Sequence, residues 1–170
     1  MVNIELPYGK ENVRRVEAII RERQLSAQVI LHPTTLIRNL ESHLKLYGGT
    51  ADQVLKCLCF MSRGKPLVVM ASGEIRIDMK KLEKLSDIKD CRMATPQELE
   101  KEFGRIPGSI DPLTIPENIP VFADEKLFQK EWVVGSAGSP YAGLKIAPKE
   151  ILKVRNVKIA DLASAVEVKK

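Results

Sequence analysis

The residue of this sequence whose type and position most directly suggest chemistry is a lysine inside an apolar run. Lys56 lies within Val54–Met61, where every other residue is apolar, and such a run predicts a buried strand. A lysine is rarely placed there unless its ammonium reaches a partner, a cavity or the end of the strand. The side chain could extend to solvent at the edge of the strand. Alternatively, it is a cation at the floor of a pocket, where it could bind an anion or a polarised carbonyl.

A proline-rich loop downstream could supply the complementary donors. Residues 104–120 contain Pro107, Pro112, Pro116 and Pro120, and prolines make a loop stiff, so its N–H groups can point in defined directions. Gly108 would let a ligand approach the backbone closely. We therefore expect the N–H groups of Gly108, Ser109 and Ile110 to stabilise a developing oxyanion. A loop that only wraps the edge of a sheet is the alternative interpretation.

A third candidate region contains small residues. Gly135, Ser136 and Gly138 follow an apolar strand and could form the wall of a pocket that binds substrate, or a plain hairpin turn. Asp124 also follows an apolar strand. We include this carboxylate among the candidate substrate-binding residues, although a hydrogen bond to loop backbone is the simpler role for it.

Composition narrows the class of protein. The 170 residues are 44% hydrophobic and 29% charged, which fits one domain spanning residues 1–170. No membrane-length apolar stretch and no signal peptide are visible, so we expect a cytoplasmic protein and no membrane partner. Three cysteines and two histidines without ligand spacing argue against a metal. The sequence contains no phosphate-binding glycine motif of the kind that binds a nucleotide, so we expect no cofactor. The net charge of +5 favours acidic partners such as RNA.

The periodicity of the sequence predicts an α/β fold of the α+β type. The hairpin pairs favour a mixed, mostly antiparallel, curved sheet or barrel flanked by helices. We expect helices over 11–24, from Thr34 or Thr35 to Tyr47, from Asp78 through Leu85, over 95–104 and after Pro148, the last followed by a polar tail. Strands are expected over 27–31, 54–61, 67–71, 91–94, 121–123, 132–135 and 143–147.

Five segments occur in the order seen in YbaK-like proteins, relatives of the editing domain inserted in bacterial prolyl-tRNA synthetases. These segments are 53–58, 93–99, 108–112, 119–124 and 135–138, and the resemblance covers residues 28–162. In that family the strand lysine matches Lys56, and the G-x-x-x-P loop matches Gly108 and Pro112. Two features depart from the family pattern: Leu113–Ile115 follows the loop proline, and the glycine-rich turn reads Gly-Ser-Ala-Gly.

The resemblance implies an aminoacyl-tRNA hydrolase with a mixed α/β fold. Its substrate would be a mischarged tRNA, usually tRNA-Pro carrying alanine or cysteine, and its partner would be tRNA rather than DNA. Whether a synthetase recruits the protein stays open. Two alternatives also stay open, since fold does not determine function. The chain could be a non-catalytic module that binds tRNA or a partner, or a hydrolase of a small acylated metabolite.

Overall fold

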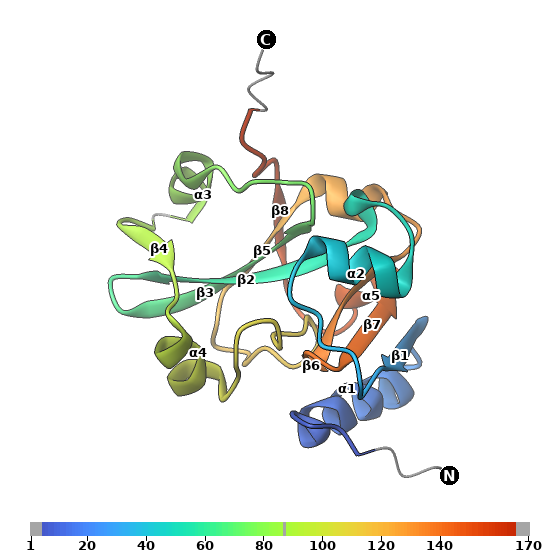
Figure 1. The fold of residues 1–170 in the computed structure, drawn as a ribbon. Coiled ribbons are helices and arrows are strands. Elements are labelled where there is room, and N and C mark those ends of the chain that lie inside the picture. The colour runs from blue at the N-terminus through green and yellow to red at the C-terminus, as the bar shows by residue number, and fades with distance from the viewer. Residues whose placement is uncertain (1–4, 87, 166–170) are drawn as a thin grey trace.

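The computed structural model describes residues 5–86 and 88–165 and contains two sheets. Figure 1 shows the longer sheet running across the molecule, with the smaller sheet beside it. Within the described residues the α-helices are Lys10–Arg23 (α1), Leu40–Tyr47 (α2), Met79–Ser86 (α3), Pro96–Phe103 (α4) and Pro148–Ile151 (α5), and two 3₁₀ turns are Ala51–Gln53 and Glu125–Gln129. The strands are Ala27–Leu31 (β1), Leu55–Ser62 (β2), Lys65–Ser72 (β3), Cys91–Met93 (β4), Val121–Asp124 (β5), Val133–Ser139 (β6), Ala142–Ile146 (β7) and Lys158–Ala160 (β8).

The larger sheet is mixed. Its strand order is β4-β2-β3-β5-β8; β2 pairs antiparallel with β3 and β4, whereas β3–β5 and β5–β8 are parallel. The smaller sheet, β1-β7-β6, is antiparallel throughout. A single parallel bridge between Val54 and Val134 joins the two sheets. The predicted α/β class with a mostly antiparallel mixed sheet is confirmed. The barrel alternative is wrong, because the sheets of the described residues do not close on themselves.

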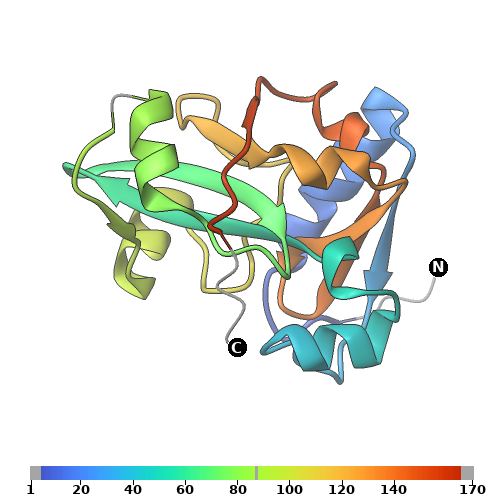
Figure 2. The same cartoon turned by 90° about the horizontal axis from the view of Figure 1, so that it is seen from above.

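Alternation along β2 distributes its side chains between two cores. Leu55 and Cys59 pack into the larger core together with α1 and the strands of the smaller sheet. Phe60 packs on the other face, in a core that includes Leu82 of α3. Figure 2 shows α3 lying over one face of the larger sheet, while α1 and the smaller sheet lie beyond its end. This two-sided burial explains why the sequence of β2 is an apolar run rather than an alternating one.

The local signals for most elements are confirmed. Thr95 caps α4, because its side chain accepts the Glu98 N–H while the Glu98 carboxylate accepts the Thr95 N–H, and Pro96 occupies the first helical position. The Asp78 carboxylate accepts the N–H groups of Lys80 and Lys81 at the start of α3.

Two predictions of local structure are wrong. The second helix begins at Leu40 rather than at Thr34 or Thr35, because Asn39 forms a reciprocal capping box with Ser42 and so sets the start of the helix. The segment predicted as a polar tail contains β8, which pairs in parallel with β5. Its side chains are mostly exposed, so an edge strand of this kind carries no apolar signal. No helix among the described residues is long and apolar enough to cross a membrane.

Candidate functional site

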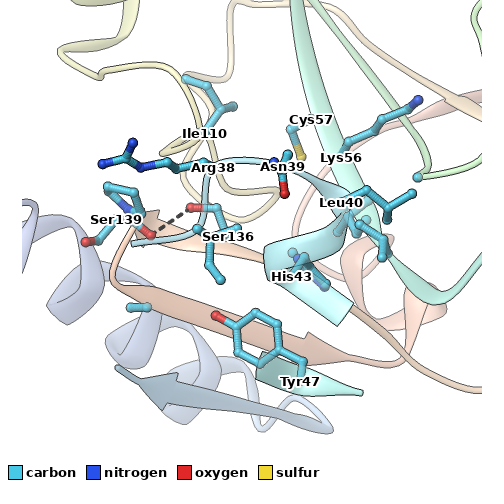
Figure 3. Close-up of a pocket in the computed structure, with 18 of the residues that line it drawn as sticks. Arg38, Asn39, Leu40, His43, Tyr47, Lys56, Cys57, Ile110, Ser136 and Ser139 are labelled. Carbon is cyan, nitrogen blue, oxygen red and sulfur yellow. Dashed lines mark hydrogen bonds between the residues drawn. The ribbon is translucent and has the colours of Figure 1, made fainter. Parts of the chain in front are cut away.

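A cavity of about 400 Å³ lies where β2, α2, β6 and the proline-rich loop meet. Figure 3 shows side chains from these elements surrounding it. It is lined by Ile37, Arg38, Asn39, Leu40, His43, Tyr47, Val54, Leu55, Lys56, Cys57, Leu58, Gly73, Gly108, Ile110, Gly135, Ser136, Ser139, Pro140 and Ala142. The structure therefore brings the lysine strand, the loop and the small residues of β6 to one place, although Lys56 and Ser136 are 80 positions apart in sequence.

Lys56 lies at one side of this cavity. Its backbone pairs with Ala71 of β3, and its side chain shares the face of Leu58 and Phe60, as the alternation predicted. The Nζ donates to the carbonyl oxygen of Ile75, and in Figure 3 the side chain extends away from Ser136. The residue is half-buried, and burial lowers the pKa of its ammonium. Lys56 therefore lies in the wall of the cavity and its ammonium is hydrogen-bonded to the protein, instead of extending freely into solvent.

Gly108 and Ile110 of the proline-rich loop also line the cavity. Gly108 has φ +80°, a conformation that favours glycine, and a Cβ built there would meet nothing within 4 Å. The buried Ser109 is used internally: its N–H donates to the Ile106 carbonyl at 3.1 Å, and its Oγ donates to the same oxygen at 2.6 Å. Among the hydrogen bonds of the described residues, none uses the N–H of Gly108 or Ile110. These two N–H groups are therefore available to a ligand in the cavity, and the oxyanion role expected of them stays a prediction.

A buried ion pair holds this loop in place. Asp111 is 1% exposed and lies 3.5 Å from the guanidinium of Arg105. Its carboxylate accepts the N–H groups of Leu113 and Thr114 at 2.9 and 2.8 Å, and the Thr114 hydroxyl at 2.5 Å. Arg105 donates to Thr114 Oγ1 at 2.7 Å and to the Gly138 carbonyl at 3.4 Å. Burial raises the pKa of Asp111 and lowers the pKa of Arg105, so these donors and acceptors offset a real desolvation cost.

Gly135 and Ser136 contribute to the cavity wall from within β6, which continues to Ser139. The prediction that residues 135–138 form a plain hairpin turn is therefore wrong, because they belong to a strand that pairs with β7 and the turn follows at residues 140 and 141. A Cβ on Gly135 would lie 2.8 Å from the carbonyl oxygen of Leu55, so glycine permits the close approach of β6 to β2. The Ser136 Oγ donates to the Ser139 carbonyl at 3.3 Å and accepts the Gly138 N–H at 3.2 Å. The wall is therefore ordered by its own hydrogen bonds.

Four of the predicted site residues lie outside the lining of this cavity, namely Ser109, Pro112, Asp124 and Gly138. Asp124 is fully buried, and its carboxylate accepts the N–H groups of Lys126 and Leu162 at 3.1 and 2.8 Å. It thereby ties β5 to the segment that follows β8. Gly138 contacts Asn12, whose side chain donates to its carbonyl. Pro112 is buried beside the Asp111 turn. Substrate contact by these residues stays a prediction.

The sequence reasoning missed the wall formed by α2 and the residues before it. Arg38, Asn39, His43 and Tyr47 line the cavity. His43 and Tyr47 are four residues apart on an amphipathic helix, which places them on one face. That spacing was the available signal, but neither residue belongs to a recognisable catalytic motif.

Two histidines flank the ring of Tyr47. The His32 Nδ1 donates to the Thr35 carbonyl at 2.7 Å, because a carbonyl can only accept, and His32 Nε2 therefore accepts the Tyr47 hydroxyl. The His43 ring lies edge-on to Tyr47, with 4.7 Å between ring centroids. Burial and the neighbouring His32 lower the pKa of His43 to about 4, so His43 is neutral near pH 7. Burial also raises the pKa of Tyr47.

The charged residues of the lining are of one sign. Arg38 and Lys56 supply its long basic side chains, and no Asp or Glu is among the lining residues of the described chain. Across residues 5–86 and 88–165, no group of three or more His, Cys, Asp or Glu side chains could hold a metal ion. A cavity with cations and unused backbone donors is suited to an anionic or polarised ligand. Fold and cavity together define a mixed α/β domain with a binding site of this kind.

Comparison with known proteins identifies the family. The family profile described as "Aminoacyl-tRNA editing domain" matches residues 34–154, which include β2, the proline-rich loop and β6. The chain belongs to this family of aminoacyl-tRNA editing domains, the YbaK family that the sequence motifs resemble. The solved structure of "a putative trans-editing enzyme for prolyl tRNA synthetase" superposes with a TM-score of 0.79 at 26% identity, covering 91% of this chain and 98% of that one.

The chain is similar to a relative of comparable length and to one segment of a much longer enzyme. The chain is 29% identical over 125 residues to the "Putative Cys-tRNA(Pro)/Cys-tRNA(Cys) deacylase EbsC" of Enterococcus faecalis, covering 73% of this chain and 76% of that protein. It is 32% identical over 114 residues to the proline–tRNA ligase of Streptococcus suis, where 63% of this chain matches only 18% of the ligase. The similarity to the ligase therefore concerns one segment of that enzyme.

Proposed function

We propose that this protein is a trans-editing aminoacyl-tRNA deacylase that hydrolyses the ester between a wrongly attached amino acid and the terminal adenosine of tRNA. Ala-tRNA-Pro or Cys-tRNA-Pro would be its substrate. The observation that carries the proposal is the convergence of Lys56, Gly108 and Ile110 on one cavity of about 400 Å³. Membership of the editing-domain family and the likeness to EbsC support the reaction class.

The proposed mechanism assigns a cation and backbone donors to the scissile ester. The N–H groups of Gly108 and Ile110 would stabilise the oxyanion that forms when the carbonyl is attacked, while Ser109 would hold the turn. Lys56 would leave the Ile75 carbonyl to bind the terminal ribose or phosphate and orient the ester. Its lowered pKa also makes a proton-transfer role accessible.

The nucleophile would come from outside the protein. The cavity contains Ser136, whose hydroxyl is hydrogen-bonded within its own strand, and Cys57, whose pKa is raised by burial, so neither is an activated nucleophile. Water would attack the carbonyl, the ester C–O bond would break, and the proton of the water would pass to the leaving ribose oxygen, giving free amino acid and tRNA. If the cysteinyl thiol attacked instead, the amino acid would leave as a thiolactone that water then opens, and attack by the 2′-hydroxyl would only move the ester, which water would still have to cleave.

The test is hydrolysis of Ala-tRNA-Pro, Cys-tRNA-Pro and Pro-tRNA-Pro by the wild-type protein and by Lys56→Ala. We expect cleavage of the alanyl or cysteinyl ester, sparing of the prolyl ester, and a loss of at least about 100-fold in turnover with Lys56→Ala. Lys65→Ala is the matched control, because Lys65 is exposed at the other end of the same hairpin.

The outcomes separate the alternatives. Near-normal deacylation by Lys56→Ala would refute the role of that lysine, and equal cleavage of all three esters would refute the specificity. Binding of tRNA without turnover would identify a non-catalytic module. Turnover indifferent to the tRNA body would identify a hydrolase of small acylated compounds.

A further inference from the structure

Arg38 is the ionised cavity residue that the proposed mechanism does not use. Its backbone N–H donates to Ser42 Oγ at 3.0 Å, within the capping box of α2, so its Cα is held at the edge of the cavity. Its side chain is exposed. Among the described residues, no hydrogen bond or ion pair involves its guanidinium, although eight ion pairs are present elsewhere.

The position of Arg38 complements that of Lys56. In Figure 3 the side chains of Arg38 and Lys56 extend in opposite directions from the site. Lys56 donates to the Ile75 carbonyl, and His43, with its pKa lowered to about 4, carries no charge near pH 7. The lining contains no carboxylate to neutralise either cation.

We infer that Arg38 is a positioning residue that binds a phosphate group of the substrate, namely the phosphodiester on the 5′ side of the terminal adenosine, while the aminoacyl ester occupies the cavity. This inference rests on the proposed function. A planar guanidinium can contact two phosphate oxygens at once, which also fixes the direction in which the nucleotide enters. An exposed side chain suits this role because the phosphate stays at the mouth of the cavity, in contact with water.

The experiment pairs removal of the guanidinium with removal of the phosphate. Wild type, Arg38→Gln and Arg38→Lys are assayed on 3′-O-alanyl or cysteinyl adenosine 5′-phosphate and on the same esters of adenosine, with spontaneous hydrolysis subtracted. We expect Arg38→Gln to lower kcat/KM about tenfold on the 5′-phosphate and to leave the adenosine ester unchanged. Arg38→Lys keeps the positive charge but not the planar guanidinium that contacts two oxygens, so it should lower kcat/KM by an intermediate factor.

Arg63→Gln is the matched control. Arg63 is an exposed arginine in the β2–β3 turn, away from the cavity lining, and its replacement removes the same charge. On aminoacyl-tRNA, Arg38→Gln should also reduce the slope of log kcat/KM against log salt by about 0.7, as expected for one phosphate contact to a single strand. Arg63→Gln should leave the slope unchanged.

The results distinguish this inference from the proposed function. If wild type cleaves the esters and Arg38→Gln slows both equally, or slows neither, phosphate binding by Arg38 is overturned. If wild type cleaves neither the small esters nor aminoacyl-tRNA, the proposed function fails and this inference fails with it.

Discussion

Replacing Asp111 by Asn tests whether the buried ion pair positions the proposed oxyanion loop. The substitution preserves the shape of the side chain, and its amide oxygen can still accept the N–H groups of Leu113 and Thr114. It removes the charge opposite Arg105, which is 6% exposed and 3.5 Å away. The principal effect is therefore a buried cation without its counter-charge.

The expected magnitude follows from that burial. Breaking a buried pair by removing one partner costs about 3–5 kcal/mol in the free energy of unfolding. For a domain of this size, a loss of about 4 kcal/mol in the free energy of unfolding lowers Tm by roughly 8–16 °C. The assay is urea or thermal unfolding, and deacylation by the folded fraction should also decrease, because Gly108 and Ile110 belong to the same loop.

Three further variants complete the experiment: Arg105→Met alone, the double variant and a surface control. In the double variant Arg105→Met/Asp111→Asn both charges are absent, so we expect a loss smaller than the sum of the single losses by about 1–3 kcal/mol. Asp90→Asn is the control, since Asp90 forms an exposed pair with Arg63 and should change stability by less than about 1 kcal/mol. Strictly additive losses, or a loss below about 1 kcal/mol for Asp111→Asn, would refute the reasoning.

Three further outcomes are expected. In the unfolded chain His43 takes up a proton near the ordinary pKa of 6.5, whereas in the folded protein its pKa is about 4. As the pH falls from 6.5 to 4, the free energy of unfolding of the wild type should therefore decrease by about 3 kcal/mol more than that of His43→Gln. Parallel curves of stability against pH would contradict this. Gly135→Ala places a Cβ 2.8 Å from the Leu55 carbonyl oxygen, and chemical denaturation should show a loss of about 1–3 kcal/mol; a loss under about 0.5 kcal/mol would mean that β6 moves freely. Gly108→Ala meets no atom within 4 Å but must adopt φ +80°, so it should cost about 1–2 kcal/mol in unfolding free energy from backbone strain alone; an unchanged Tm would argue against that conformation.

Local signals account for the parts of the fold that the sequence predicted correctly. The Thr95 capping box, the Asp78 cap and the apolar run of β2 act over a few residues, so their meaning does not depend on distant contacts. The start of α2 was mispredicted because Asn39 competes with Thr34 and Thr35 as the helix cap. β8 was missed because its side chains are mostly exposed, and its pairing with β5 depends on backbone hydrogen bonds that leave no apolar pattern.

For the candidate site, the sequence by itself determined which residues are chemically unusual: a lysine in an apolar strand, a glycine in a proline-rich loop, and a run of small residues. Their type and neighbours sufficed, because burying a charge or permitting a positive φ is a local physical requirement. Only the tertiary structure decided that Lys56, Gly108, Ile110, Gly135 and Ser136 share one cavity. It also revealed that the His43 and Tyr47 rings of α2, together with Arg38 just before that helix, form another wall of the cavity, since these relations depend on how the two sheets and the loop pack together.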